Sequence, residues 1–199
     1  MTDLTTTPDR PAPPSTGALL VAMQQHEPGM AGHLRRVGRS AVALAAATHP
    51  EVLDDPAAVA AFWLHDIGKL AVDAELLTAS RTLTPHERRL LAEHPAAGQR
   101  LAAAHQLPPG TGTLIRAHHE RLDGTGYPDG LAGDEIPVAA RILSVADVFD
   151  ALTSVRSYQR PRSTEQALEE LWAVRGRQLD GDLVAAFTTL VDAAQAAAA

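Results

Sequence analysis

The chain has 199 residues, of which 45% are hydrophobic and only 4% aromatic, and its 24 acidic and 17 basic side chains give a formal net charge of −7. The lack of cysteine excludes disulfides and thiolate zinc sites and suits a reducing cytosol, while the acidic balance argues against a broad nucleic-acid-binding surface and a nucleic-acid partner. A core of mainly Ala, Leu and Val favours closely packed helices, so we expect one all-α domain, a helical bundle.

The two ends of the chain differ from its middle. The first residues, 1–16 (MTDLTTTPDRPAPPST), are rich in Thr and Pro without apolar periodicity, so we expect a disordered tail. A single domain is expected over residues 17–195, followed by an Ala-rich end at 196–199. No stretch approaches the roughly 20 apolar residues of a membrane span, and no signal peptide is recognisable. The sequence therefore predicts a soluble, cytoplasmic protein without a membrane partner.

Two helices are expected before residue 50. The first covers residues 17–25 and ends near Pro28 and Gly29, because both residues disfavour a continued helix. The second covers about 30–48, where apolar residues recur at the spacing of one buried helix face. Its expected core residues are Leu34, Val37, Ala41, Leu44 and Ala45. His33 lies one residue from this face, near the start of the helix.

The run AAFWLHDIGK at residues 60–69 closes a helix that the Asp-Asp-Pro sequence at 54–56 is expected to open. Neighbouring residues sit about 100° apart around a helix, so His65 and Asp66 cannot share one face in its interior. In the frayed last turn, before Gly68, they can converge on one metal ion. The alternative is a buried histidine bonded to a helix-end carboxylate, and only further ligands elsewhere decide between the two.

A loop with one apolar anchor, Leu76 and Leu77, is expected over residues 70–83. The residues Thr-Pro-His-Glu at 84–87 then form a capping box with Pro at the first helical position, which predicts a helix to about residue 93.

Histidines stand at the ends of the next two predicted helices. His94 lies where Pro95 interrupts the helix, which then continues to about residue 105. A helix over about 111–120 ends in the adjacent residues His118 and His119, and so repeats the arrangement at residues 65 and 66.

A glycine-rich loop, RLDGTGYPDGLAGDEIP at 121–137, separates this helix from the next, because four glycines and two prolines among charged residues cannot form a regular element. Pro137 starts a helix that extends to about residue 154, and in it Asp147 stands beside the apolar face, where a carboxylate is costly without a compensating positive charge. Further helices are expected over 163–175 and 182–195. The expected core residues of the helix after Pro137 are Ile142, Leu143, Ala146, Phe149 and Ala151.

The candidate ligands are five histidines and two aspartates on helices or at helix ends. They are His33, His65, Asp66, His94, His118, His119 and Asp147. Seven groups exceed the needs of one ion but fit a two-metal centre with about three ligands per ion and a bridging carboxylate. Nitrogen and oxygen ligands without sulfur suit iron, manganese or zinc. The remaining histidines with helix-end or polar-face positions are expected to be solvated; they are His26, His49, His86 and His105.

Five sequence blocks together resemble the HD-GYP family of the HD superfamily of metal-dependent phosphohydrolases. They are HLRRV at 33–37, HDIGK at 65–69, HPAAG at 94–98, HHERLDGTGYPDGL at 118–131 and IPVAARILSVADVFDALTS at 136–154. The resemblance covers about residues 26–190. It implies an HD-domain helical bundle with an ordered GYP loop and a metal centre in its core, and a bacterial phosphodiesterase that hydrolyses the second messenger cyclic di-GMP by metal-activated hydroxide.

By the same resemblance, two divalent ions would be bound, with iron or manganese preferred and zinc, magnesium, nickel or cobalt left open. His33, His65, Asp66 and Asp147 would surround one ion and His94, His118 and His119 the other, with Asp66 as the bridge and part of the catalytic group together with His65 and Lys69. Lys69 would contact the scissile phosphate and Arg156 the phosphates of the ligand. Gly126, Tyr127 and Pro128 would line the edge of the substrate pocket and offer a contact for a protein partner. The simpler interpretations are that Lys69 caps a helix C-terminus and that Arg156 is a surface charge.

Departures from the family pattern limit what the resemblance implies. Members with a third metal carry a Glu four residues before the first ligand histidine, where this chain has Gly29 and only Glu27 nearby. A dinuclear centre, and a single cleavage to linear pGpG before any further step to GMP, is therefore favoured. The segment after HDIGK also lacks the usual Ile-Pro-Asp and Lys-Pro-Gly elements. Two alternatives stay open: a catalytically weak module that binds cyclic dinucleotides or proteins, and an HD phosphohydrolase that acts on another cyclic dinucleotide or nucleotide.

Overall fold

The computed structural model describes residues 16–154 and 161–198, and all regular elements within these ranges are helices, as the composition predicts. The α-helices are α1 (Gly17–His26), α2 (Met30–Thr48), α3 (Pro56–Leu64), α4 (Ala74–Leu77), α5 (Pro85–Leu91), α6 (His94–Ala104), α7 (Thr111–Ala117), α8 (Val138–Thr153), α9 (Thr164–Val174) and α10 (Gly181–Ala198). Short 3₁₀ segments are η2 (Pro50–Asp54), η3 (Ile67–Ala71) and η4 (Gly133–Glu135).

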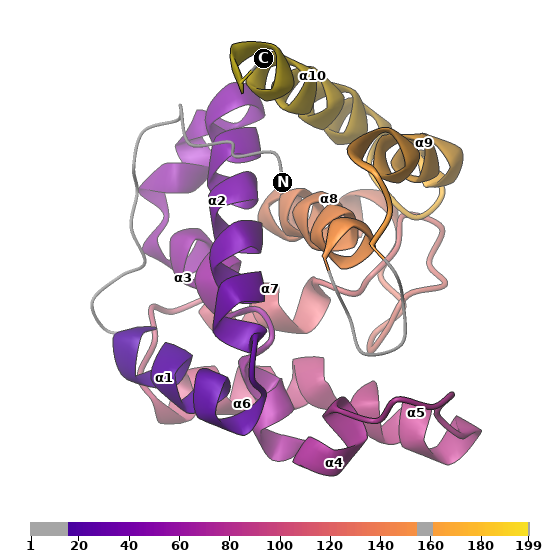
Figure 1. Ribbon diagram of the computed structural model, residues 1–199. Coiled ribbons are helices and arrows are strands. Elements are labelled where there is room, and N and C mark those ends of the chain that lie inside the picture. The colour runs from indigo at the N-terminus through magenta and orange to yellow at the C-terminus, as the bar shows by residue number, and fades with distance from the viewer. Residues whose placement is uncertain (1–15, 155–160, 199) are drawn as a thin grey trace.

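Helix α2 is the central element of the bundle. It packs against α3 and α8 and also contacts α1 and α10. Figure 1 shows α9 and α10 at the top of the molecule and α1, α4, α5 and α6 along the bottom. Because α6 packs on α7 and η3, and α3 packs on α7, the ends of these elements meet beside the first turns of α2. The predicted ligands come from this meeting point.

The core is aliphatic, as expected from the scarcity of aromatic residues. The apolar stripe predicted for α2 is buried throughout, with Leu34, Val37 and Leu44 fully inaccessible. Helix α3 is buried on every side over residues 57–64, which is the pattern of a helix that is apolar all round. It therefore holds the residues that follow it, His65 and Asp66, deep inside the bundle.

The predicted helix starts are confirmed by their caps. Asp55 accepts a hydrogen bond from the backbone N–H of Ala57 and caps α3. Thr84 and Glu87 form the expected capping box at α5. At α9, Ser163 is the N-cap residue and its reciprocal partner is Gln166.

A close approach of backbones brings η3 against α6. A Cβ atom at Gly68 would lie 1.8 Å from the carbonyl oxygen of His94 and 2.5 Å from the nitrogen of Gly98. Only glycine fits at this contact, because any side chain would push the two elements apart. Gly68 therefore allows the His65–Asp66 pair to lie next to His94.

Some details of the sequence-based prediction are wrong. Leu76 and Leu77 are only half-buried in the short helix α4, and the buried anchor of this region is Val72. Ala151 is half-buried, and the residues of α8 that are buried near its end are Phe149 and Asp150.

Other differences concern boundaries. The helix expected over 111–120 ends at Ala117. The last helix continues to Ala198, since alanine is the strongest helix former and its run carries the helix past the expected end near residue 195. The expected tail, 1–16, lies outside the described residues except for Thr16, which is buried.

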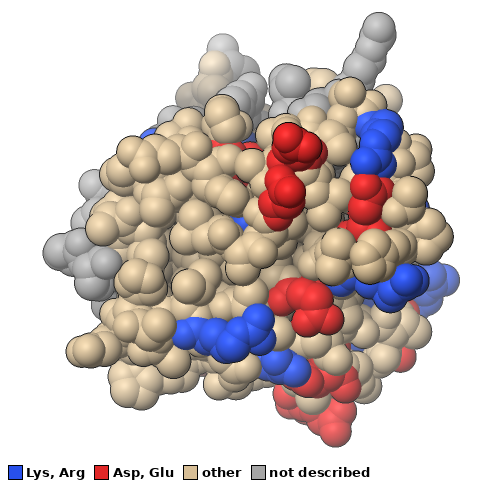
Figure 2. All heavy atoms as spheres, turned by 90° about the horizontal axis from the view of Figure 1, so that it is seen from below, with Lys and Arg blue, Asp and Glu red and all other residues tan. Residues whose placement is uncertain are grey.

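The surface carries charges of both signs. On the face seen in Figure 2, acidic and basic side chains are interspersed among uncharged ones, and neither sign dominates a large area. None of the helices within residues 16–154 and 161–198 combines the length and hydropathy that a bilayer span requires.

Candidate metal centre

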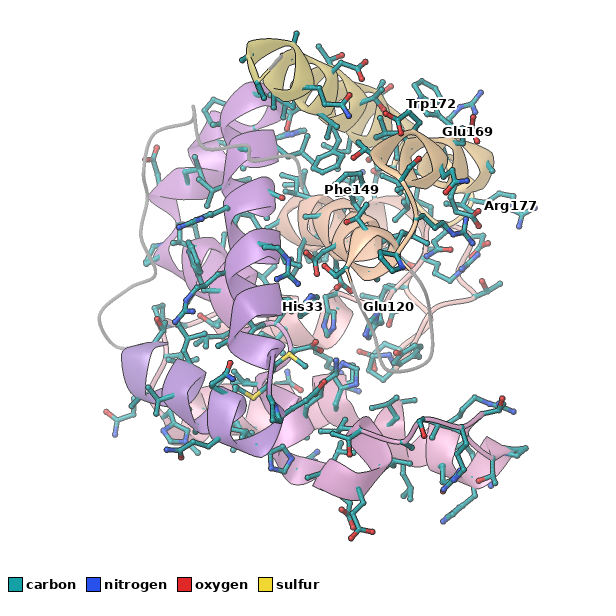
Figure 3. All side chains as sticks on the ribbon, viewed as in Figure 1. His33, Glu120, Phe149, Glu169, Trp172 and Arg177 are labelled. Atoms are coloured by element: carbon teal, nitrogen blue, oxygen red, sulfur yellow. The ribbon has the colours of Figure 1, made fainter. Side chains whose placement is uncertain are left out.

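The structure brings the seven predicted ligands together in one cluster, in which five are buried and His119 and Asp147 are half-buried. They come from the start of α2 (His33), the end of α3 (His65, Asp66), the start of α6 (His94), the end of α7 (His118, His119) and the middle of α8 (Asp147). Figure 3 shows His33 near the middle of the molecule, whereas Glu169, Trp172 and Arg177 lie at its outer edge.

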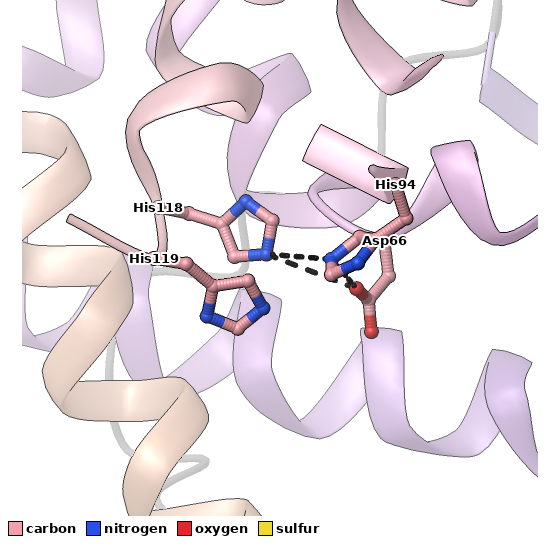
Figure 4. Close-up of side chains that lie close together, drawn as sticks. All are labelled: Asp66, His94, His118 and His119. Carbon is pink, nitrogen blue, oxygen red and sulfur yellow. Dashed lines mark hydrogen bonds and ion pairs between the residues drawn. The ribbon is translucent and has the colours of Figure 1, made fainter. Parts of the chain in front are cut away.

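Asp66 lies at the centre of the cluster and its two carboxylate oxygens face different histidines. Oδ1 is 3.1 Å from Nε2 of His94 and 3.8 Å from Nε2 of His118, as Figure 4 shows. Oδ2 is 3.4 Å from Nε2 of His33 and 3.7 Å from Nε2 of His65. One carboxylate therefore joins two groups of imidazoles.

We call these groups the first and second half-sites. The first half-site comprises Oδ2 of Asp66 with His33, His65 and Asp147, whose Oδ1 lies 3.4 Å from His33 Nε2 and 3.8 Å from His65 Nε2. The second comprises Oδ1 of Asp66 with His94, His118 and His119. In both sets, the possible ligand atoms of Asp66 and its histidines all lie within 4.8 Å of one another.

Burial sets the protonation of these groups. Burial, together with the neighbouring His65 and His94, lowers the pKa of His118 to about 3. Burial also lowers the pKa of His65 and of His119. Burial alone would raise the pKa of Asp66, but Lys69 and the surrounding histidines hold it well below its usual range. Neutral imidazoles and an ionised carboxylate are the forms that bind a metal ion.

The hydrogen bonds of the second half-site fix which ring nitrogen faces the centre. Nδ1 of His94 lies 2.7 Å from the carbonyl oxygen of Leu91, and Nδ1 of His118 lies 2.5 Å from that of Ile115. A carbonyl only accepts, so Nδ1 carries the proton, and the neutral ring of His118 presents a lone pair at Nε2. This lone pair and an anionic oxygen of Asp66 converge without a proton between them. Such a set of acceptors fits a cation.

The first half-site is supported by a carboxylate that sequence reasoning missed. Oδ2 of Asp150 accepts a hydrogen bond from Nδ1 of His33 at 2.8 Å, and Arg36 holds both oxygens of Asp150 at 2.5 and 3.1 Å. Burial would lower the pKa of His33, but the bonds and charges of Asp150, Asp66 and Asp147 raise it to about 9. The signal available in the sequence was that Asp150 follows Asp147 by three residues and so shares its helix face.

Lys69, the predicted contact to the scissile phosphate, lies beside Asp66 at the cluster. Its Nζ donates to Oδ2 of Asp66 at 2.7 Å, and its side chain is 17% exposed. Burial would lower the pKa of Lys69, but Asp66 outweighs this effect and raises it. It is the only lysine of the chain. The other predicted phosphate contact, Arg156, lies outside the described residues.

The predicted GYP loop borders the second half-site. The ring of Tyr127 lies 4.9 Å from that of His119, between Gly126 and Pro128, and Tyr127 is 36% exposed. Side-chain exposure rises from nearly zero at His118 to 14% at Asp147 and 17% at Lys69. The cluster therefore approaches solvent on the side of Asp147, Lys69 and Tyr127.

The histidines predicted to be solvated divide into two pairs. His86 and His105 are exposed, as expected. His26 is half-buried and its Nε2 lies 2.8 Å from the carbonyl oxygen of Val72. His49 is half-buried too, and its buried Nδ1 has no hydrogen-bond partner among the described residues. None of these four belongs to the seven-residue cluster.

Comparison with known proteins identifies relatives. The HD-domain family profile matches residues 19–183. The chain is 45% identical over 120 residues to the cyclic di-GMP phosphodiesterase response regulator RpfG of Xanthomonas campestris. The aligned residues make up 59% of this chain and 32% of that protein. It is 37% identical over 129 residues to a cyclic di-GMP phosphodiesterase of Thermotoga maritima, 64% of this chain and 35% of that protein. A 3′3′-cGAMP-specific phosphodiesterase of Vibrio cholerae is 39% identical over 123 residues, 61% of this chain and 24% of that protein. The chain thus spans about a third or less of the length of these curated relatives.

Solved structures share the fold. The HDGYP protein Bd1817 from Bdellovibrio bacteriovorus superposes with a TM-score of 0.64 at 20% identity, covering 80% of this chain and 51% of that one. The PgpH HD domain of Listeria monocytogenes superposes with a TM-score of 0.63 at 14% identity, covering 92% of this chain and all of that one. At such low identity these likenesses establish the bundle alone.

Proposed function

We propose a function from one premise: this chain belongs to the HD-domain family and carries an HD-GYP domain. On that basis we propose that it is a metal-dependent phosphodiesterase that hydrolyses cyclic di-GMP. Two relatives that carry that name are 45% and 37% identical to it. The proposal concerns this domain, because the relatives are longer proteins.

The observation that carries the proposal is the division of Asp66 between two sets of histidines. A carboxylate whose Oδ1 faces His94 and His118 and whose Oδ2 faces His33 and His65 suits a bridge between two ions. Asp147 would complete the first half-site and His119 the second. When bound, two divalent ions, iron or manganese by preference, activate water and withdraw charge from a phosphodiester.

The protein's own groups would bind and orient the substrate. Lys69 already lies on the Oδ2 side of Asp66, close enough for its ammonium group to reach a phosphate oxygen beside the half-sites. Arg156 would bind a second phosphate oxygen, and both cations would stabilise charge that develops as the P–O bond breaks. Tyr127 and its neighbours Gly126 and Pro128 would line the edge of the pocket. The buried imidazoles of His65 and His118 would limit the access of bulk water to the reacting phosphate.

The first turn of α2 favours a single cleavage to linear pGpG. Gly29 stands four residues before His33, where relatives with a third metal carry a Glu, and it is the N-cap of α2 with a φ of 98°. It offers no side chain, so a dinuclear centre is supported. A second cleavage to GMP would require the linear product to bind again.

A second substrate deserves a parallel test because three relatives are named as specific for 3′3′-cGAMP, at 39%, 44% and 36% identity. The two cyclic dinucleotides share their phosphodiester ring and differ in one base. The metal centre does not distinguish them, since it acts on the phosphate.

Turnover of the purified chain tests the proposal. The protein, prepared without oxygen and loaded with Mn²⁺ or Fe²⁺, is incubated with cyclic di-GMP and, separately, 3′3′-cGAMP, while metal per chain is measured. We expect two ions per chain and a linear dinucleotide product. His118→Ala should abolish product formation, and the exposed His86→Ala is the matched control that should not. Binding without cleavage by the metal-loaded chain would instead identify a binding module.

A further inference from the structure

The imidazole of His119 is held differently from its neighbours. His33, His94 and His118 each have a ring nitrogen bonded to a carboxylate or a carbonyl. The ring of His119 makes no hydrogen bond to the described part of the chain and is positioned by ring contacts. Its centroid lies 4.0 Å from that of His118, 5.0 Å from His94 and 4.9 Å from Tyr127. Packing alone therefore sets its orientation.

Tyr127 supplies the outer support among these contacts. Its ring is tilted by 30° relative to that of His119, so the two faces nearly stack, and its backbone N–H donates to the carbonyl oxygen of His119 at 3.3 Å. The loop can come this close because residue 126 is a glycine. A Cβ atom at this position would lie 2.5 Å from Cα of Glu120 and would push the loop away. The position of Tyr127 thus depends on how the loop tip is held.

A buried carboxylate holds that tip. Glu120 follows His119 directly, is 3% exposed, and accepts three consecutive backbone N–H groups. Its Oε1 accepts from Asp129 at 2.7 Å and Gly130 at 3.1 Å, and its Oε2 accepts from Leu131 at 3.1 Å. Charge-assisted bonds of this kind are about twice as strong as neutral ones, and burial strengthens them further. Figure 3 shows Glu120 toward the interior of the molecule.

The base of the loop is held by other bonds. The N–H of Leu122 donates to the carbonyl oxygen of Gln178 at 3.3 Å, that of Asp123 to Arg177 at 2.8 Å, and that of Gly133 to Leu122 at 3.1 Å. Residues 129–131 at the tip have two other supports: the exposed ion pair of Arg116 with Asp129 at 2.6 and 2.7 Å, and the packing of Leu131 against Ala117, Ile136 and Ala140. Loss of the Glu120 carboxylate should therefore loosen the tip and leave the base paired.

We propose that Glu120 is a positioning residue for the second half-site: it fixes the loop tip, the tip holds Tyr127 on His119, and His119 is thereby aimed at its metal ion. Glu120 itself touches neither metal nor substrate. The inference rests on the proposed function only in taking the cluster to bind two ions. It adds a role for the GYP loop that is separate from contact with substrate or protein.

Metal titration of the full chain tests the proposal. Glu120→Gln replaces one acceptor oxygen by an NH₂ group that opposes the backbone donors. We expect the affinity for one of two Mn²⁺ ions to fall by about 10- to 100-fold, the range for residues that support ligands, with the other ion unaffected. Arg116→Ala, which cuts the exposed tie to the same loop, is the matched control and should change neither affinity by more than about threefold, because exposed ion pairs contribute little.

Variants at Tyr127 separate positioning from general loss of structure. Tyr127→Ala should weaken the same single ion as Glu120→Gln, while Tyr127→Phe, which keeps the ring, should restore wild-type affinity. Equal weakening of both ions, or wild-type binding of both by Glu120→Gln, would overturn the proposal.

Amide hydrogen exchange gives a readout that needs neither metal nor turnover. In Glu120→Gln the amides of Asp129, Gly130 and Leu131 should exchange at least about tenfold faster, because they lose their hydrogen bonds to a charged acceptor. The amides of Leu122 and Asp123 should keep their rates. Unchanged exchange at the tip would refute the role of Glu120, whether or not the protein cleaves cyclic dinucleotides.

Discussion

The two half-sites share Asp66 but are built in different ways. In the second, the rings of His94 and His118 are anchored on carbonyls only three residues earlier in the chain, so local helix-end geometry orients them. In the first, His33 is anchored on Asp150, 117 residues away, and Arg36 holds that carboxylate in turn. One half-site therefore depends on local backbone and the other on charges that only the tertiary fold brings together.

This difference also changes the pKa values of the histidines in the two half-sites. His33 faces three carboxylates, and its pKa rises to about 9 despite its burial. His118 faces a backbone carbonyl and other imidazoles, and burial lowers its pKa to about 3. The two histidines therefore differ at neutral pH: a proton competes with a metal ion for Nε2 of His33, and none competes for Nε2 of His118.

The largest effect is expected from a change at Asp66, the carboxylate that both half-sites share. Asp66→Asn leaves one acceptor oxygen where the proposed centre uses two, so at least one ion should be lost per chain. Turnover should fall by more than about 100-fold, the upper loss expected for a residue that only supports a ligand. Metal analysis and turnover measure this. Asp73→Asn, at the exposed N-cap of α4, is the control. Two ions bound by Asp66→Asn at wild-type affinity would contradict the role of Asp66 as a bridge.

Asp150→Asn should affect the first half-site alone. The amide oxygen can still accept from His33, but the charge that pairs with Arg36 is gone, so we expect about 10- to 100-fold weaker binding of one ion. Competition with a metal chelator measures the two affinities. The ion weakened here and the ion weakened by Glu120→Gln should differ, and the double variant should lose both. If both variants weakened the same ion, the two supports would not be independent.

The pH dependence should also separate the halves. His33 holds a second ring proton below about pH 9, and a metal must displace it from Nε2. Affinity at the first half-site should therefore rise with pH up to about 9, by at most about tenfold per pH unit from this one proton. His118 has no such proton above about pH 3. Titrations between pH 6 and 9 test this, and Asp150→Asn should flatten the dependence because it removes the largest of the interactions that raise the pKa of His33.

The smallest effect is expected far from both half-sites. Thr84→Ala removes the exposed capping box of α5 and should lower the free energy of unfolding by about 1 kcal/mol or less. Urea denaturation measures this change. Metal binding should be the same as in the wild type, and a change in either affinity would mean that α5 is coupled to the cluster.

The sequence predicted the elements with strong local signals. The bounds of α2 match the expected 30–48 because a long apolar stripe lies between Gly29 and the end at Thr48. The seven candidate ligands were singled out because each stands at a helix end or beside a buried face, in blocks that resemble one family, and the structure places them in one cluster. Leu76 and Leu77 were misassigned, since two adjacent leucines in a short exposed helix give no sign of which way they face.

What could not be predicted depends on contacts between distant segments. The partner of Asp150 is on another helix, and the donors to Glu120 are the N–H groups of residues 129–131, which have no side-chain signature. The requirement for glycine at position 68 arises from the backbone of α6. Periodicity and capping rules describe one segment at a time and carry no information on such pairs.

The single lysine of the chain offers a site for selective chemical labelling beside the cluster. Lys69 is the only side-chain amine in this sequence, and its pairing with Asp66 keeps it protonated and unreactive toward acylating reagents at neutral pH. Any event that draws Asp66 away would free the amine. The rate at which one acyl group is added to Lys69, read by mass spectrometry, would therefore report on the central carboxylate without a bound substrate.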